Sequence, residues 1–384
     1  MTGVKRIAVV GAGLGGLSVA GLLQRAGFSV AVYEQAPTFS RIGAGIILSA
    51  NAMKVFRRLG IEQSLVETGI KPHSYVSRAW DTGETMYEII FDAESEARFG
   101  GPYINIHRGD LHAVLETAVA REALFFNHQL VQLEEKDDCV QLSFRNGVRA
   151  DADIVIGADG IRSKVREFLL GVEPPRFVGA VAQRAIFPTA RLGGFKIPDC
   201  TKWWGRDRHA LPYFITNKRD EIYVIGVAPA SSWDEEATSL PSSREKFIEN
   251  FEDFHDDFLR VLEAAEDVTL WPIHDRPRND CWSGGRIVLL GDAAHPVRPF
   301  MAAGGAMAAE DSAILTRCLK AFDDYKDAFR AYEATRIGRV AEVQRISAEN
   351  SWMRGPTETD WFYCYDPFTA PLSDPNISPP IKNA

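Results

Sequence analysis

The feature that most constrains this chain is a glycine-rich turn near its amino end, in which Gly11, Gly13 and Gly16 match the spacing GxGxxG. The first glycine allows a tight turn, the second lets a pyrophosphate approach the backbone, and the third allows close packing of a helix on a strand. A helix that begins at such a turn directs N–H groups and the positive end of its dipole at the phosphates. The pattern therefore predicts a dinucleotide site, although alone it is a weak signal.

The residues around the turn strengthen this prediction. An apolar run over 7–10 is typical of a buried parallel strand, 17–25 has a helical apolar pattern, and 28–33 predicts a second strand. Glu34 follows that strand where a carboxylate would accept hydrogen bonds from ribose hydroxyls. The run over 7–23 superficially resembles a signal peptide, but a folded strand–turn–helix–strand unit explains its spaced glycines better. Neither the turn nor Glu34 distinguishes FAD from NAD.

Two later segments repeat the arrangement of a buried strand that ends in glycine and aspartate. The strand predicted over 154–156 precedes Asp159, and the strand predicted over 286–290 precedes Asp292. Asp292 could accept a hydrogen bond from a sugar hydroxyl, and a helix that begins near Gly304 could direct N–H groups at an electron-rich ring or a phosphate. Either segment alone could be an ordinary strand–turn–helix corner. All three motifs in this order favour one nucleotide-binding fold.

The sequence changes character between 174 and 271. Aromatic and β-branched residues dominate there, which predicts a largely antiparallel sheet with a helical stretch near 243–264. A long helix is predicted over 325–350, and the tail after Pro356 is expected to wrap the surface. We therefore expect an α/β fold with a discontinuous Rossmann-like domain over 1–173 and 272–355, which ends in the long C-terminal helix. An inserted substrate-binding sheet domain is expected over 174–271, and a tail over 356–384.

The bulk composition limits the function classes. The formal net charge of -9 disfavours a general nucleic-acid role, because phosphate neutralisation needs clustered Lys and Arg. No stretch approaches the ~20 consecutive apolar residues that a membrane span needs. The five cysteines are odd in number and widely spaced, so reduced thiols in a cytoplasm are the simpler expectation. No spacing of His, Asp and Glu indicates a metal site.

Taken together, these segments resemble the class A flavoprotein monooxygenases of the para-hydroxybenzoate and salicylate hydroxylase type, over nearly the whole chain. Arg108 matches an arginine that in this family lies along the flavin ribityl chain and phosphate, and Arg41 matches a position near the flavin and the nicotinamide approach. The resemblance implies FAD as cofactor, NADH or NADPH as transient electron donor, and O2 as co-substrate. The cofactor contacts that it implies are Gly11, Gly13, Gly15, Gly16, Glu34, Gln35, Arg41, Arg108, Leu130, Asp159, Asp292, Gly304 and Gly305.

Within this family the chain most resembles the 6-hydroxynicotinate 3-monooxygenases, through segments such as 202–204, 207–209 and 218–221. This resemblance implies two catalytic residues: Tyr213 would hold or help deprotonate a ring hydroxyl, and His209 would hold a carboxylate or ring oxygen. The alternative for His209 is an ordinary structural histidine. The substrate-binding residues that it implies are His209, Tyr213, Ile47, Cys200, Ile225 and Phe300.

The chain departs from that branch at three positions. Ile47 and Phe300 stand where the branch has pocket histidines, and Ala303 replaces a glutamine near the flavin. Two polar groups replaced by apolar ones predict a more apolar pocket. Because a polar group lost from a buried site leaves the substrate's polar atoms unpaired, the preferred ring substituent is expected to differ.

The implied activity is hydroxylation of an electron-rich hydroxylated pyridine or benzoate ring, with loss of a ring carboxylate where the attacked carbon carries one. The same chemistry on another substituted hydroxypyridine or a salicylate-like ring is an alternative. Two other classes stay open: a flavin-dependent dehydrogenase or reductase without oxygen insertion, and a non-catalytic flavin or nucleotide sensor. We expect a monomer or homodimer that takes a small aromatic substrate and binds neither nucleic acid nor membrane.

Overall fold

The amino end folds as the predicted strand–turn–helix–strand unit. The computed structural model, which describes residues 6–39, 41, 44–234 and 237–375, has β1 at Arg6–Val10, α1 at Leu14–Arg25 and β2 at Ser29–Tyr33. β1 lies between β2 and β11 (Ile154–Gly157) and pairs in parallel with both. The spaced glycines therefore belong to a folded nucleotide-binding unit, as predicted.

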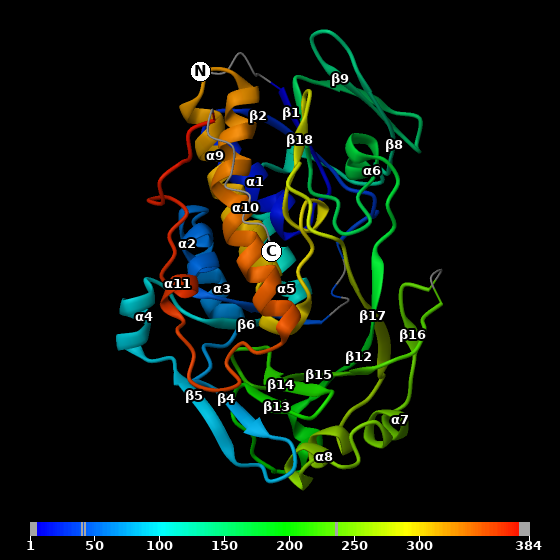
Figure 1. Ribbon diagram of the computed structural model, residues 1–384, viewed down its shortest axis with the longest axis vertical. Helices are drawn as coiled ribbons and strands as arrows, with labels where there is room; N and C mark the ends of the chain where they lie inside the picture. The colour runs from blue at the N-terminus through cyan, green and yellow to red at the C-terminus, as the bar shows by residue number, and fades with distance from the viewer. Residues whose placement is uncertain (1–5, 40, 42–43, 235–236, 376–384) are drawn as a thin grey trace.

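A six-stranded sheet forms the centre of the upper half of the molecule in Figure 1, with the order β18-β19-β11-β1-β2-β7. The additional strands are β18 (Ser283–Gly284), β19 (Ile287–Leu289) and β7 (Leu124–Phe125). β19, β11, β1, β2 and β7 pair in parallel, so their carboxyl ends meet at one edge. Continuous apolar runs are needed in such strands because both faces of a parallel sheet are covered.

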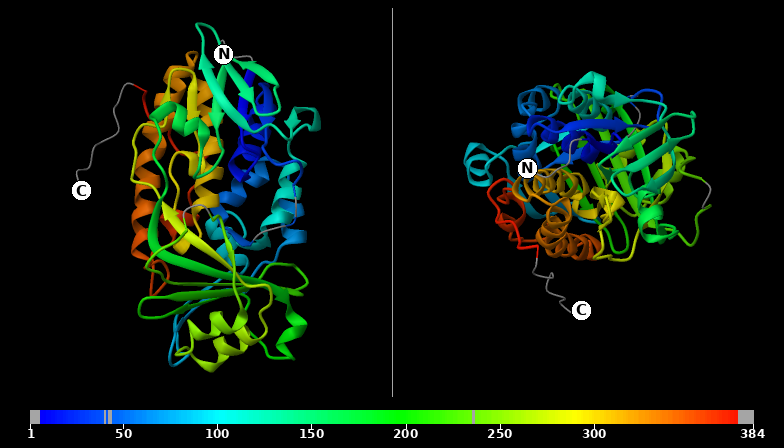
Figure 2. Two further views of the ribbon diagram at one scale, coloured as in Figure 1. Left: turned by 90° about the vertical axis from the view of Figure 1, so that its right-hand side faces the viewer. Right: turned by 90° about the horizontal axis from the view of Figure 1, so that it is seen from above.

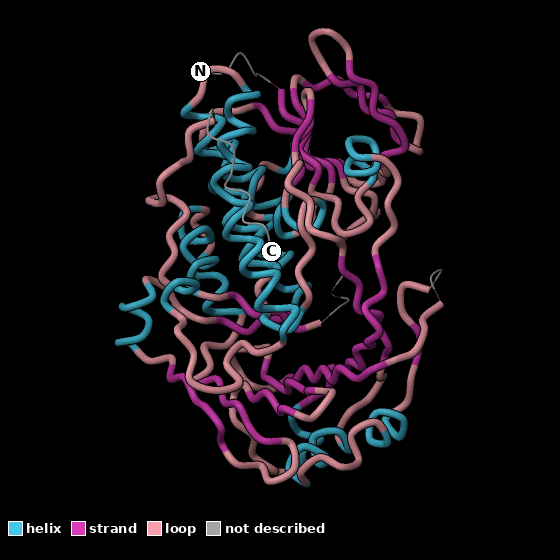
Figure 3. The backbone as a smooth tube through the Cα atoms, viewed as in Figure 1, coloured by secondary structure: helices cyan, strands magenta, loops and turns pink. Residues whose placement is uncertain are grey.

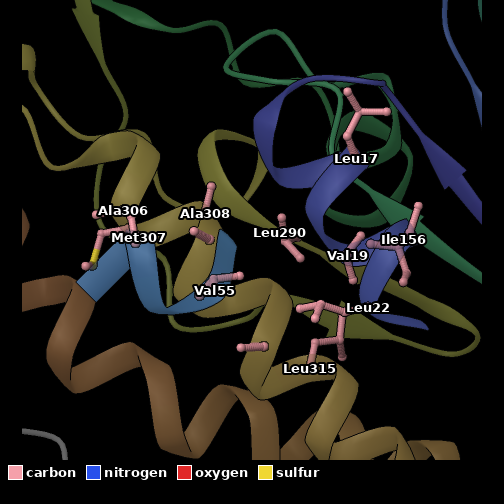
Figure 4. Packing of buried hydrophobic residues seen from close by; sticks show 14 of the residues in the cluster. Leu17, Val19, Leu22, Val55, Ile156, Leu290, Ala306, Met307, Ala308 and Leu315 are labelled. Atoms are coloured by element: carbon pink, nitrogen blue, oxygen red, sulfur yellow. The ribbon is translucent and has the colours of Figure 1, made fainter. Parts of the chain in front are cut away.

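Helices cover this sheet through small and apolar side chains. α9 (Gly304–Ala321) packs on α1 and on α2 (Ala50–Arg58), and α10 (Tyr325–Glu349) packs on α9. Figure 4 shows Leu22 of α1 beside Leu315 of α9, and the small residues Gly15 and Ala308 face each other where the two helices approach. The long C-terminal helix predicted from the sequence is α10, and it lies alongside α9 in Figure 1.

An eight-stranded sheet forms the lower half of the molecule, as the left view of Figure 2 shows. Its order is β16-β17-β12-β15-β14-β13-β4-β5, and its strands are Leu240–Pro241, Thr269–Asp275, Arg176–Pro188, Glu221–Pro229, His209–Phe214, Thr201–Trp204, Ser74–Ala79 and Thr85–Ile90 respectively. α7 (Arg244–Glu249) and α8 (Asp256–Glu263) cover the face away from the upper half. The sheet is mostly antiparallel, as predicted, and β13 pairs with β4 in parallel.

Two strands of this sheet come from outside the range 174–271 that the aromatic composition marked. β4 and β5 form a hairpin on the edge of β13, so the lower sheet draws residues 74–90 from the first part of the chain. β4 pairs with β13 through residues such as Val76 and Thr201, which are 125 residues apart, and so distant a pairing leaves no local signal in the sequence. The domain boundaries themselves stay predictions.

Figure 3 distinguishes the remaining helices and strands by colour. The predicted hairpin over 130–144 is β8 (Leu130–Glu135) and β9 (Val140–Phe144), with β10 (Arg149–Ala152) beside it. β3 (Gly45–Leu48) pairs with β6 (Ile104–His107) and contributes to one wall of the site described below. The other elements are α3 (Glu62–Thr68), α4 (Ala93–Phe99), α5 (Arg108–Glu116), α6 (Lys164–Leu170) and α11 (Asp360–Tyr363).

The tail after Pro356 does not simply wrap the surface, so that prediction is wrong at α11. Phe362 and Tyr363 are buried in the main core. Lys54 of α2 donates hydrogen bonds to three backbone carbonyls of the tail, which holds it against the body of the protein. Within the described ranges, no helix combines the length and the apolar character that crossing a membrane requires.

Candidate active site

A large cleft lies at the edge of the central sheet where β1, β11 and β19 end. It has an empty volume of about 1360 Å³, and the lower sheet forms its opposite wall. Six of the predicted cofactor residues line it: Gly13, Gly15, Arg108, Asp292, Gly304 and Gly305. The carboxyl ends of parallel strands are where ligands bind in open α/β sheets. Segments far apart in the sequence are thus brought to one site.

The glycines of the first turn have different structural reasons. Gly11 has φ +95°, and a Cβ there would lie 2.6 Å from the carbonyl oxygen of Ala158. A Cβ at Gly16 would lie 1.9 Å from the carbonyl oxygen of Gly11, so only glycine lets α1 approach β1. At Gly13 a Cβ would meet nothing within 4 Å. Gly13 therefore exposes its backbone to the cleft, which is the position where a pyrophosphate would approach.

Glu34 is positioned by the backbone around it. Its carboxylate accepts hydrogen bonds from the N–H of Ala12 (2.9 Å) and of Ala36 (2.8 Å), which fixes it at the end of β2. Gln35 beside it is exposed, and Leu130 is buried at the start of β8. None of the predicted contacts Glu34, Gln35 and Leu130 lines the large cleft.

Asp159 is engaged in holding α6. One carboxylate oxygen accepts from the hydroxyl of Ser163, and the other accepts from the backbone N–H of Lys164 (2.7 Å) and Val165 (3.2 Å). The side chain satisfies N–H groups that the first turn of a helix leaves without partners. Asp159 thus shapes the turn after β11, while its neighbour Gly160 lines the cleft.

Arg41 joins the two halves of the protein. Its guanidinium donates to both oxygens of Asp110 on α5 (2.8 and 3.1 Å) and to Glu221 on β15 (2.5 and 3.3 Å). These hydrogen bonds raise the pKa of Arg41 above its usual value. Arg41 is therefore a bridge between α5 and the lower sheet, and it does not line the cleft.

A buried charge network anchors the turn that carries Asp292. Asp311 of α9 accepts hydrogen bonds from the N–H of Gly291 (3.1 Å), from His295 Nε2 (2.6 Å) and from Arg336 of α10 (2.7 Å). Arg336 also pairs with Glu310 at 2.6 Å, and Arg336, Glu310 and Asp311 are fully buried. The network leaves no signal in the sequence, because its pairs join α9 to α10 and to the turn before α9 without a regular spacing.

A second, inner cavity adjoins the large cleft. It is smaller than the cleft, and the two spaces share Ile47, Leu211, Ile225, Pro299 and Ala302 as lining residues. The predicted substrate residues His209 and Phe300 also line the inner cavity. Two of the three positions that depart from the related branch, Ile47 and Phe300, therefore line this space, and Ala303 does not. Most of the remaining wall is aromatic or aliphatic: Tyr75, Tyr103, Val227, Met301, Trp352 and Met353.

His209 is buried and held by a chain of hydrogen bonds. Lys202 Nζ donates to Asn350 Oδ1 (2.9 Å), so the amide nitrogen of Asn350 is the group that donates to His209 Nδ1 (3.0 Å). Burial and the nearby Lys202 hold the pKa of His209 well below 6.5. The imidazole is therefore neutral, and its Nε2 carries the proton. The ring of Phe300 packs edge-on against it at 5.1 Å.

Tyr213 lies on the same strand and lines the large cleft. Its ring packs against Gly45, where a Cβ would lie 2.7 Å from the phenolic oxygen, and meets Tyr223 edge-on at 5.2 Å. Burial raises the pKa of Tyr213 well above 10, so the phenol keeps its proton and can donate. Cys200 forms a β-bridge with Tyr213 but lines neither space, and burial raises the pKa of its thiol.

Two cations at the site were not among the predicted site residues. Lys202 lines the inner cavity and Arg184 of β12 lines the large cleft. Lys202 belongs to the segment 202–204, which resembles the 6-hydroxynicotinate 3-monooxygenases, but a lysine by its residue type alone is not expected to line a buried cavity. Long cationic side chains are almost always near water, so composition argues against such positions.

Comparisons with known proteins agree with this geometry. The sequence profile of the FAD binding domain family matches residues 5–346. The chain is 45% identical over 375 residues to 6-hydroxynicotinate 3-monooxygenase of Bordetella bronchiseptica, covering 97% of this chain and 98% of the relative. It is 36% identical over 362 residues to 3-amino-4-hydroxybenzoate 2-monooxygenase of Streptomyces cremeus, covering 92% and 90%. These relatives give the dehydrogenase alternative no support.

Solved structures share the fold. Klebsiella pneumoniae HpxO complexed with FAD and uric acid has a TM-score of 0.80 at 25% identity, over 94% of this chain and 92% of that one. A salicylate hydroxylase substrate complex has a TM-score of 0.81 at 22% identity, over 94% and 96%. The chain therefore belongs to the FAD binding domain family, and within it to the FAD-dependent aromatic monooxygenases.

Proposed function

We propose that this enzyme hydroxylates a six-membered aromatic ring that carries both a hydroxyl and a carboxylate, with 6-hydroxynicotinate as the first candidate. The observation that carries the proposal is the inner cavity, which is mostly apolar and adjoins the large cleft. His209 and Tyr213 extend from one strand along these two spaces. A mostly apolar pocket with a few polar groups is the usual form of a small-molecule site.

The large cleft fits FAD. Open space at the Gly13 backbone, the amino ends of α1 and α9, and the cation Arg108 together suit a pyrophosphate-bearing cofactor. When bound, FAD takes electrons from NADH or NADPH and activates O2 for transfer to the ring. We assign the lining residues Gly13, Gly15, Arg108, Asp292, Gly304 and Gly305 to FAD, with Glu34 toward the ribose. Gln35, Arg41, Leu130 and Asp159 stay predictions as direct contacts.

Two polar side chains would orient the ring. His209 and Tyr213 are four residues apart on β14, so their Cα atoms are ~13 Å apart along the strand. A ring with polar substituents on opposite sides can form one hydrogen bond at each end of this span. Neutral His209 would donate from Nε2 to an oxygen of one substituent. Tyr213 would hold the ring hydroxyl, whose deprotonation raises the electron density of the ring.

The apolar wall would keep water away from the reacting ring. Ile47 and Phe300 replace polar groups with hydrocarbon at the inner cavity, next to the cleft. Excluding water protects reactive oxygen from release as peroxide. Because of these two residues, this enzyme would differ from its relatives most in which ring substituent it prefers and in the fraction of NAD(P)H oxidation that is coupled to hydroxylation.

The first experiment measures NADH and NADPH oxidation by the FAD-loaded protein across hydroxypyridine carboxylates, acyl hydroxypyridines and hydroxybenzoates. Product masses under 18O2 report oxygen insertion. Turnover of 6-hydroxynicotinate to a dihydroxypyridine supports the proposal in its narrow form. Stimulation by another hydroxylated ring alone would shift the substrate and make Ile47 and Phe300 the specificity determinants. Oxidation of substrate without incorporated label would overturn the hydroxylase assignment.

A tyrosine variant tests the orienting role. Tyr213→Phe is expected to lower the fraction of NADH oxidation coupled to hydroxylation by about tenfold, with flavin content unchanged. Tyr332→Phe is the matched control, because Tyr332 is buried outside both spaces and donates to the carbonyl of Leu289. Equal coupling in wild type and Tyr213→Phe, on every ring that is turned over, would remove Tyr213 from the mechanism.

We further propose that the protein is a monomer or homodimer in a cytoplasm. All five cysteines are free thiols, of which Cys139, Cys200 and Cys318 are buried. Such thiols suit a reducing compartment. Light scattering at working concentration would report the oligomeric state, and a tetramer would contradict the proposal.

A further inference from the structure

Lys202 brings a buried cation to the inner cavity. The residue is 2% exposed, and its ammonium donates to the carbonyl oxygen of Phe300 (3.0 Å) and to Asn350 Oδ1 (2.9 Å). The Nζ atom also lies 3.8 Å from the ring centroid of Trp204. All three partners are neutral, and over the described ranges no carboxylate forms an ion pair with Lys202.

This environment stabilises the ammonium only in part. An ammonium has three donors, and protein acceptors occupy two of them. Burying a charge without a counter-charge is costly, and the cation Arg354 lies over the same Trp204 ring, 5.8 Å from its centroid. Burial and Arg354 hold the pKa of Lys202 well below its ordinary value. An anion in the cavity would counter this shift, favour the charged ammonium and supply the missing partner.

We propose that Lys202 recognises the anionic substituent of the substrate, a ring carboxylate, from inside the inner cavity. This inference rests on the proposed function and deepens it. His209 is linked to Lys202 through Asn350, so the two side chains form one binding group for the carboxylate. The carboxylate end of the ring then lies in the inner cavity, and the hydroxyl end faces Tyr213 in the large cleft.

Arg184 is the competing cation. It lines the large cleft, stacks on Trp271 at 5.1 Å, and is aligned with Ile225 across the sheet. A carboxylate bound by Arg184 would lie on the cofactor side, beside Tyr213 and Tyr223. The inner cavity favours Lys202, because its wall is mostly apolar and the anion would be more fully removed from water there.

The test measures ligand binding separately from turnover. Oxidised, FAD-loaded protein is titrated without NAD(P)H, and the change in flavin absorbance gives a Kd for 6-hydroxynicotinate and for its neutral amide, 6-hydroxynicotinamide. Wild type is expected to prefer the carboxylate. Lys202→Met should weaken carboxylate binding by about 10- to 100-fold and change amide binding by less than about threefold. Lys54→Met is the control, since Lys54 also donates to backbone carbonyls but lies outside both spaces.

Three outcomes would overturn the inference. Equal loss of both ligands in Lys202→Met, with normal flavin content, would make Lys202 a structural residue. Loss of carboxylate preference in Arg184→Gln but not in Lys202→Met would assign the anion to the other cation. A wild type without preference would leave no anion site. Failure of the proposed function is distinguishable, because carboxylate preference that depends on Lys202 can be measured even if no ring is hydroxylated.

Discussion

Replacing Arg336 with methionine tests whether the buried charge network holds the cofactor turn. The guanidinium lies 2.7 Å from Asp311 and 2.6 Å from Glu310, and all three side chains are fully buried. The hydrogen bonds and opposite charges of this network keep the pKa of Asp311 low, at about 2, although burial alone would raise it. Methionine has a similar length but no charge, so the substitution isolates the electrostatic contribution.

The expected destabilisation follows from what the variant leaves behind. Removing one partner of a buried ion pair costs about 3–5 kcal/mol, because the remaining charge is neither paired nor hydrated. Glu310 keeps Arg339 at 2.8 Å and Asp311 keeps His295 at 2.6 Å, so the lower half of that range is expected. The flavin affinity should fall as well, since Asp311 holds the N–H of Gly291 in the turn that carries Asp292.

The assay is urea unfolding of the flavin-free protein, followed by tryptophan fluorescence, with a separate FAD titration. Arg345→Met is the matched control: Arg345 is on the same helix and pairs with Glu342 and Glu349, but its side chain is 54% exposed. Exposed pairs contribute about 0–1 kcal/mol. Free energies of unfolding for the two variants that agree within about 1 kcal/mol would refute the reasoning.

Three further predictions follow from the site. Gly16→Ala should prevent α1 from packing on β1 and give insoluble protein. Gly13→Ala should fold, as circular dichroism would show, and bind FAD at least tenfold more weakly in a flavin titration. Normal FAD binding by both variants would contradict the assigned roles. Ionised Asp311 should contribute about 2 kcal/mol to the free energy of unfolding at a pH above its ordinary pKa of 3.8, and this contribution should be lost as the pH falls from about 4 toward 2. If the urea midpoint of Asp311→Asn depends on acid pH as that of the wild type does, Asp311 does not make this contribution. Phe300→Ala should remove the edge-on contact with His209, admit water to the inner cavity and raise the yield of hydrogen peroxide severalfold. Unchanged peroxide release would show that Phe300 does not keep water from the reaction.

The sequence determined the features that depend on local chemistry. The turn at Gly11–Gly16 was predicted from the glycine spacing, the apolar runs on both sides and the acidic residue after the second strand. These signals are local because a tight turn and close helix packing restrict individual positions to glycine. The long helix α10 and the hairpin β8–β9 followed from periodicity. Of the predicted substrate residues, Ile47 and Phe300 do line the inner cavity, and a departure from the family pattern was the signal.

Only the tertiary structure decided which polar groups meet. Lys202 binds Asn350 across 148 residues and Asn350 binds His209 across 141, and no periodicity records such partners. Asp311 and Arg336 form their ion pair only after α9 and α10 pack. Local sequence patterns determine which face of a helix or strand is buried. A buried charge, by contrast, is stabilised by a partner that lies near it only after the elements have packed. For that reason the sequence alone predicted a flavin fold and a class of chemistry, and the cation at the substrate cavity required the structure.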